Sequence, residues 1–201
     1  GPGEYTVTVS FLLREKTLWA EAGHEVAFGQ YVYSVEGAEK APVSGVEIVR
    51  SLHNIGVRGE NFEVMFSVLN GGLVSYKYAG REMLEAIPKP NFWRAPTDND
   101  CGNQMPMRYA QWKIASMYAS HKEFRKGMYG PSNAPETTVH DNSVEVAFTY
   151  IMPTTPVSEC RLAYEVFGDG RVKTTLTYDP VKELGDMPEF GVLFKFNADY
   201  D

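Results

Sequence analysis

The residues best suited to chemistry lie in one segment, 91–102, which reads NFWRAPTDNDCG. It holds two carboxylates, Asp98 and Asp100, with the amide of Asn99 between them. Two carboxyl groups that converge can divide acid and base roles when the environment raises the pKa of one, and the amide could hydrogen-bond a ligand hydroxyl. The competing interpretation is structural: Asp98 and Asp100 form Asx turns and an ion pair with Arg94. We favour the structural interpretation.

No metal site is predicted. The spacing of Asp98 and Asp100 suggests a calcium loop, but the twelfth residue of such a loop would be Tyr109 instead of a bidentate glutamate. The cysteines, Cys101 and Cys160, form no C-x-x-C pair, so we predict two free thiols and no zinc site or disulfide framework. The sequence also has no G-x-S-x-G nucleophile motif and no phosphate-binding loop.

The elements that must position this segment are mostly strands, because the hydrophobic pattern has a period of two. Turn signals separate the runs, above all Asn70-Gly71-Gly72 and Gly168-Asp169-Gly170, where glycine accepts the positive φ of a tight hairpin. One stretch, 107–118, is predicted to be helical. These features predict an all-β fold, a large sandwich. The predicted strands are 5–12, 25–35, 45–49, 62–69, 73–78, 143–151, 160–167, 171–178 and 190–196.

A domain boundary is predicted within 36–42, a small and charged segment that interrupts the strands. Residues 1–38 hold too few strands to bury a core of their own. They are therefore interpreted as the end of a domain that begins upstream, and 39–201 as a partial sandwich domain. Because the chain starts inside a strand-like run, it is typical of a piece of a longer protein.

The net charge of -7, with basic residues scattered among acids, argues against a nucleic-acid partner. No apolar run approaches the roughly 20 residues that span a bilayer, so no membrane partner is expected. The first residues do not resemble a signal peptide. The compartment stays open between cytoplasm, periplasm and secretion.

Two segments, 18–30 (LWAEAGHEVAFGQ) and 91–102, resemble in order and separation the large beta-galactosidases of glycoside hydrolase family 2. The second is similar to that family's N-F-W-R-A-P-T-D-N-D-x-G signature. A weaker match is 187–191 (MPEFG), where Glu189 stands in place of the family's usual arginine. The resemblance implies that the chain begins in the last strands of the second immunoglobulin-like domain. It then enters the final sandwich, which is of the galactose-mutarotase type.

The resemblance also implies a function. The parent enzyme would hydrolyse terminal β-D-galactosides with retention, which requires two carboxyl groups about 5–5.5 Å apart, and the family carries them in a TIM barrel absent here. No catalytic residue is therefore expected in this chain. The implied partners are the barrel, the β-galactoside substrate through the parent enzyme, and further copies in a homo-oligomer. No cofactor is expected in this part, because the family often binds Mg²⁺ and Na⁺ elsewhere.

The segment 91–102 would then support the substrate side of the pocket through Arg94, Asp98, Asn99, Asp100 and Gly102. By the same resemblance, residues 101–107 would form a mobile lid with Gly102 as its hinge. Two alternatives stay open: a carbohydrate-binding sandwich without chemistry, and a purely structural domain.

Each of the three tryptophans could stack on a sugar ring or belong to the core. Trp19 is interpreted as a core residue at a domain seam and Trp93 as a core residue, and Trp112 is left undecided. An incomplete sandwich also leaves apolar surface exposed, which predicts self-association.

Overall fold

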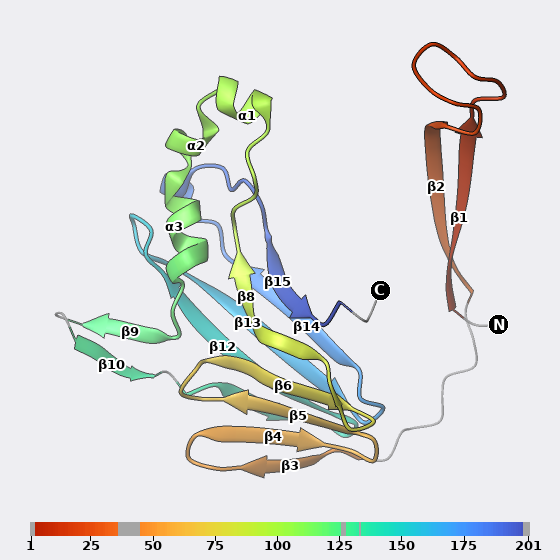
Figure 1. The fold of residues 1–201 in the computed structure, drawn as a ribbon. Helices are drawn as coiled ribbons and strands as arrows, with labels where there is room; N and C mark the ends of the chain where they lie inside the picture. The colour runs from red at the N-terminus through yellow and green to blue at the C-terminus, as the bar shows by residue number, and fades with distance from the viewer. Residues whose placement is uncertain (1–2, 36–44, 126–127, 133, 199–201) are drawn as a thin grey trace. The chain divides into compact units, whose positions relative to one another are not determined.

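Strands dominate the described chain, as the period-two pattern predicts (Figure 1). The computed structural model describes residues 3–35, 45–125, 128–132 and 134–198. It divides into two compact units, Gly1–Pro42 and Val43–Asp201. The predicted interruption at 36–42 lies outside the described residues. Within the described ranges, no helix has the length and apolar character needed to cross a membrane.

The first unit is an antiparallel hairpin of β1 (Gly3–Leu12) and β2 (Glu25–Val35). Tyr5 pairs with Tyr33, and their rings stack with centroids 5.6 Å apart. Within this unit both strands are exposed along their whole length, because a two-stranded hairpin supplies no second layer of its own against which to bury a face. Trp19, in the connection between the strands, contacts His24 edge-on and is 66% exposed. Trp19 is therefore exposed within this unit, and its predicted burial at a domain seam stays a prediction.

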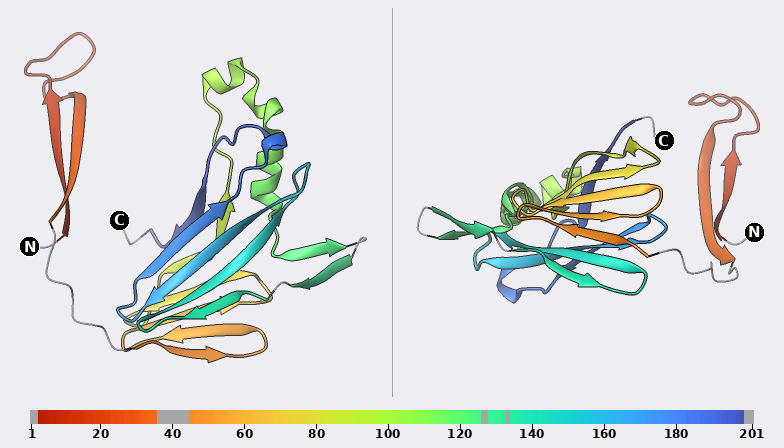
Figure 2. Two further views of the ribbon diagram at one scale, coloured as in Figure 1. Left: turned by 180° about the vertical axis from the view of Figure 1, so that it is seen from behind. Right: turned by 90° about the horizontal axis from the view of Figure 1, so that it is seen from below.

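The second unit contains two antiparallel sheets that face each other (Figure 2). The five-stranded sheet consists of β3 (Glu47–Arg50), β4 (Asn54–Arg58), β5 (Phe62–Ser67), β6 (Gly72–Tyr78) and β7 (Arg81–Glu82). The four-stranded sheet consists of β11 (Glu136–Val139), β12 (Ser143–Met152), β13 (Ser158–Phe167) and β14 (Val172–Tyr178). The predicted glycine turns close two of the hairpins, with Gly71 at φ 69° and Gly170 at φ 87°.

The core lies between these two sheets and follows from the alternation of residues along their strands. In β5, Phe62, Val64 and Phe66 point inward, whereas Glu63 and Met65 are exposed. The ring of Phe66 lies 6.4 Å from that of Phe148 in β12 and 5.5 Å from that of Tyr164 in β13. These contacts across the layers confirm the predicted all-β sandwich.

A third pair of strands carries the candidate segment. β8 (Leu84–Asn91) pairs antiparallel with β15 (Gly191–Phe196), about 100 residues further along the chain. The sequence pattern did not predict β8, because it contains Pro88 and Pro90, which are rare inside strands. They are tolerated here because the structure gives β8 a hydrogen-bonded strand partner on one side only. The strands β4, β7 and β11 of the two large sheets were also missed.

Three helices follow β8 and lie beyond or beside the strand ends: α1 (Asp98–Gly102), α2 (Met105–Arg108) and α3 (Ala110–Tyr118) (Figure 1). The prediction of a helix over 107–118 is confirmed for α3. Trp112, on α3, is 1% exposed, with ring centroids 5.9 Å from Phe92 and 5.8 Å from Tyr178. It is therefore a core residue. The remaining elements are β9 (Lys122–Arg125), β10 (Met128–Ser132) and the 3-10 helix Lys182–Leu184.

Candidate functional site

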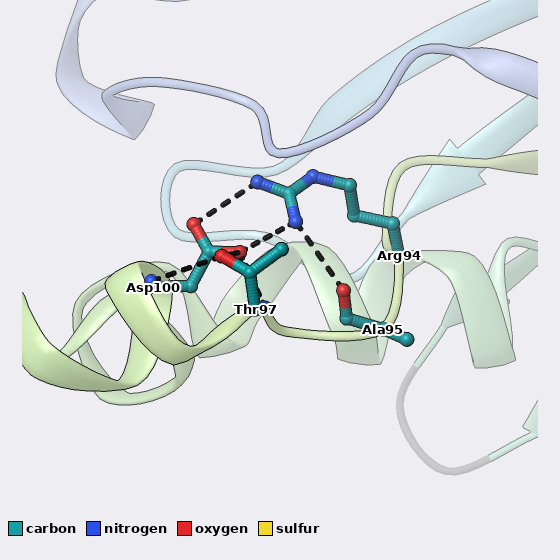
Figure 3. Close-up of polar contacts among 4 residues, drawn as sticks. All are labelled: Arg94, Ala95, Thr97 and Asp100. Carbon is teal, nitrogen blue, oxygen red and sulfur yellow. Dashed lines mark hydrogen bonds and ion pairs between the residues drawn. The ribbon is translucent and has the colours of Figure 1, made fainter. Parts of the chain in front are cut away.

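The centre of segment 91–102 is an ion pair between Arg94 and Asp100 (Figure 3). The guanidinium is bidentate: Nη1 donates to Oδ2 of Asp100, and Nη2 donates to Oδ1 at 3.0 Å. Nη1 also reaches the carbonyl of Ala95 at 3.3 Å. The Asp100 side chain is largely buried, with 12% exposed, against 39% for Arg94. The predicted ion pair thus forms, and it ties the strand end to the first helix.

Thr97 completes this arrangement and was missed in the sequence. Its hydroxyl accepts the Asp100 backbone N–H at 3.2 Å and donates to the Asp100 carboxylate at 2.9 Å. The Thr97 backbone N–H donates to the same carboxylate at 2.8 Å. This is a capping box, which begins α1 where a loop with Asx turns was predicted. The signal that could have revealed it is a threonine followed three residues later by an acid.

These contacts fix the charge state of Asp100. Hydrogen bonds from Arg94, followed by that from the Thr97 N–H, hold the pKa of the Asp100 carboxyl well below its usual range. The Asp100 carboxylate in turn raises the pKa of Arg94. A general acid in a glycosidase needs a raised pKa instead. Asp100 therefore lacks the raised pKa that the acid of a catalytic pair requires.

The other predicted site residues do not converge on Asp100. Asp98 and Asn99 are exposed on α1, and residues two apart in a helix point to different sides. Gly102 is the last residue of α1 and has no contact that a side chain would disturb. The residue with a left-handed backbone conformation in this part of the chain is Gln104, with φ 63°, just before α2. The geometry therefore singles out Gln104, instead of Gly102, as the irregular point between α1 and α2.

The structure also brings the two family-like segments of this unit together. Gly191 pairs with Asn91 in the β8–β15 ladder, and the rings of Phe190 and Phe92 lie 6.2 Å apart. The negative charge of Glu189 also acts on Arg94 and contributes to raising the pKa of its guanidinium group. Arg94 is thus flanked by two acids, one of which the sequence did not associate with it. Trp93 is partly buried against the core, as predicted.

The described residues contain no group of three or more His, Cys, Asp or Glu side chains that could hold a metal ion. Cys101 is exposed, Cys160 is buried, and both are free, which confirms the prediction of free thiols.

The lowered pKa of Asp100 makes a testable prediction. A carboxyl whose folded pKa lies below its unfolded value, about 3.9 for aspartate, stabilises the fold above that pH and loses this contribution as the pH falls. We expect the Asp100 carboxyl carbon, followed by NMR, to titrate below pH 3.9, and Arg94→Ala to raise the midpoint. Arg171→Ala, which removes the separate exposed pair with Asp169, should leave it unchanged. A midpoint at or above the free value would contradict the assignment.

Comparisons with known proteins agree with this architecture. A family model described as beta galactosidase small chain matches residues 58–201, and one described as beta-galactosidase, domain 4, matches residues 1–34. The chain is similar to a beta-galactosidase of Clostridium acetobutylicum, with 35% identity over 100% of the chain and 21% of the relative. A beta-galactosidase of Halalkalibacterium halodurans is 37% identical over 99% of the chain and 19% of the relative.

A third relative, a beta-galactosidase small subunit of Latilactobacillus sakei, is 32% identical over 70% of the chain and 47% of its own length. The chain thus spans about a fifth of the length of the two longer relatives. The small-chain model covers well over half of the 201 residues. By this match and by its sandwich fold, the chain belongs to the beta-galactosidase small chain family.

Proposed function

We propose that the chain is a non-catalytic part of a β-galactosidase that hydrolyses terminal β-D-galactosides with retention. The two glutamates that cleave the bond would lie in a TIM barrel outside these 201 residues. Two findings support this proposal: relatives named beta-galactosidase match the chain from end to end, and about four fifths of their length lies outside the match. In this proposal residues 1–38 are the last strands of an immunoglobulin-like domain, and residues 39–201 are part of the final sandwich.

The observation that carries the proposal is the state of Asp100. A retaining glycosidase needs two carboxyl groups free to act on the sugar, one of them as a proton donor. Both oxygens of Asp100 accept hydrogen bonds from Arg94, and Oδ2 also accepts two from Thr97. Of the two carboxylates that the sequence offered as a catalytic pair, Asp98 and Asp100, only Asp98 is left without these bonds. Segment 91–102 is held in place by the ion pair of Arg94 with Asp100 and by the hydrogen bonds of Thr97. A segment fixed in this way could form a wall on the substrate side of the pocket.

The wall role can be tested in a full-length relative that carries this segment. Replacing Asp100 by Asn or Arg94 by Lys should lower kcat/KM by about tenfold or more, or about 1.4 kcal/mol, because α1 loses its bidentate anchor. The control is Asp169→Asn, which weakens a separate ion pair that Asp169 makes through one contact with Nε of Arg171. Unchanged kinetics in the Arg94 and Asp100 variants, with the fold retained, would assign the segment to scaffolding. Turnover of a chromogenic galactoside by the pure 201-residue chain would refute the non-catalytic role.

We also propose that the protein forms homo-oligomers and that the chain by itself self-associates. Leu193, Phe194 and Phe196 of β15 are exposed, as are the apolar residues of the β1–β2 hairpin. Exposed strands with apolar side chains favour pairing with another chain. Light scattering should show a mass that rises with concentration, and Phe196→Lys should reduce this rise. Leu52→Lys, at an exposed apolar residue outside β15, should not. A constant monomer mass would contradict the proposal.

A second candidate function is a carbohydrate-binding module without chemistry. The observation that favours it is a cleft beside Tyr118, described in the next subsection. Mg²⁺ and Na⁺, which the resemblance associates with the parent family, are proposed to bind outside this chain.

A further inference from the structure

A cleft of about 430 Å³ is lined by residues from the end of α3, the start of β9 and the turn between β12 and β13. Its apolar wall is formed by Ile151, Met152 and Val157, with the ring of Tyr118 at the end of α3. Tyr118 is 61% exposed and Val157 67% exposed. An exposed phenol ring beside an apolar floor suits a ligand that has one apolar face and polar edges.

The polar groups of the cleft restrict the ligand further. Lys122 and Glu159 both line it, and neither makes an ion pair within the described part of the chain, with each other or with another residue. An anionic ligand would be attracted by Lys122 and repelled by Glu159. A cationic ligand would be attracted by Glu159 and repelled by Lys122. A neutral ligand with several hydroxyls satisfies both, because each hydroxyl can donate to the carboxylate or accept from the ammonium.

The cleft is also preformed. Ser120 and Ile151 exchange backbone hydrogen bonds of 3.0 and 2.7 Å, which fix the end of α3 to the end of β12. In the turn beyond β12, the buried Thr154 hydroxyl donates to the carbonyl of Pro156 at 2.7 Å, and it lies 2.8 Å from the Ser158 hydroxyl. A ligand would therefore bind without first ordering the wall, which reduces the entropic cost of binding.

We propose that this cleft is a carbohydrate-binding site for a neutral sugar of one or two rings, whose C–H face packs on Tyr118. Its volume falls within the range of small-molecule pockets, about 300–1,000 Å³. None of its lining residues belongs to segment 91–102. The choice of a β-galactoside as the ligand rests on the proposed function, whereas the site itself rests on the cleft.

The experiment is an NMR titration of the 201-residue chain with lactose, with sucrose in parallel. Saturable shifts of amides around the cleft are expected with lactose. Tyr118→Ala should weaken the affinity at least tenfold, and Glu159→Lys should weaken it as well. The matched control is Tyr78→Ala, at another exposed tyrosine, which should bind as the unmodified chain does. Circular dichroism checks that each variant keeps its fold.

Two outcomes would overturn the site: no saturable shift up to the solubility of lactose, or full binding by both Tyr118→Ala and Glu159→Lys. An equal response to sucrose would overturn the choice of a β-galactoside as the ligand. An Arg94→Ala arm separates this proposal from the proposed function. Binding lost in Arg94→Ala but kept in Tyr118→Ala would remove the cleft and leave the role of segment 91–102 intact. Binding lost in Tyr118→Ala alone supports the cleft.

Discussion

Replacing Trp112 by alanine should lower the free energy of unfolding by about 3–5 kcal/mol, the usual cost of deleting a large buried ring. Trp112 is 1% exposed and lies between Phe92 and Tyr178. Its removal leaves a cavity where α3 meets β8 and β14. Urea denaturation followed by circular dichroism measures the change, because the midpoint shifts in proportion to the lost stability.

The matched control is Trp19→Ala. Because Trp19 is 66% exposed, this change should lower the free energy of unfolding only slightly. Trp112→Phe is a finer test. The indole N–H is buried without an acceptor among the described residues, so this change removes no hydrogen bond found there and keeps a ring. Trp112→Phe should therefore lower the free energy of unfolding by less than Trp112→Ala does. Equal effects at Trp19 and Trp112 would contradict the assignment of Trp112 to the core.

The same change should reach the candidate site. The Ser116 hydroxyl donates to the carbonyl of Trp112 and accepts the backbone N–H of Phe92, each at 2.8 Å. Through these bonds α3 fixes the start of segment 91–102. Loosening Trp112 is therefore expected to increase hydrogen exchange at Phe92 and Trp93 more than in β4 or β5, where the opposing layer is intact.

Gly71→Ala should lower stability by about 2–5 kcal/mol, from left-handed backbone strain and overpacking together. Gly71 has φ 69°, and a Cβ there would lie 2.1 Å from the ring of His121. His121 is 7% exposed, so its ring would have to shift within a buried environment to make room for the added Cβ. The Tyr150 hydroxyl also donates to the Gly71 carbonyl, which holds the backbone in place.

Two variants separate the causes. Gly80 has φ 78° but no atom within 4 Å of an added Cβ, so Gly80→Ala measures the backbone strain alone. The double variant Gly71→Ala with His121→Ala removes the clash and should recover part of the loss, which a double-mutant cycle quantifies. If Gly71→Ala costs no more than Gly80→Ala, the contact between Gly71 and His121 is not tight in solution.

Burial of His121 has its own pH consequence. Burial, and then the charge of Lys122, lower the pKa of this imidazole. A histidine whose folded pKa lies below its unfolded value, about 6.5, stabilises the fold above that pH and loses the contribution as the pH falls. The loss of stability on acidification should therefore be smaller in His121→Gln.

Much of this protein can be read from local patterns. The alternation of apolar and polar residues predicts most strands of the sandwich, and the glycine turns at 70–72 and 168–170 predict two of its hairpins. The ion pair of Arg94 with Asp100 follows from residues only six positions apart. These features depend on backbone geometry and on near neighbours, which the sequence states directly.

Other features were decided by contacts between residues far apart in the chain. The pairing of Asn91 with Gly191, the charge of Glu189 at Arg94 and the ring of His121 on Gly71 join segments between 50 and 100 residues apart. The burial of Trp112, undecided from its pattern, depends on Tyr178 in another strand. Sequence patterns thus determined most strands of the sandwich, the helix α3 and the position of the family signature. Only the tertiary structure decided which elements meet, because packing and charge act through space whereas local propensity acts along the chain.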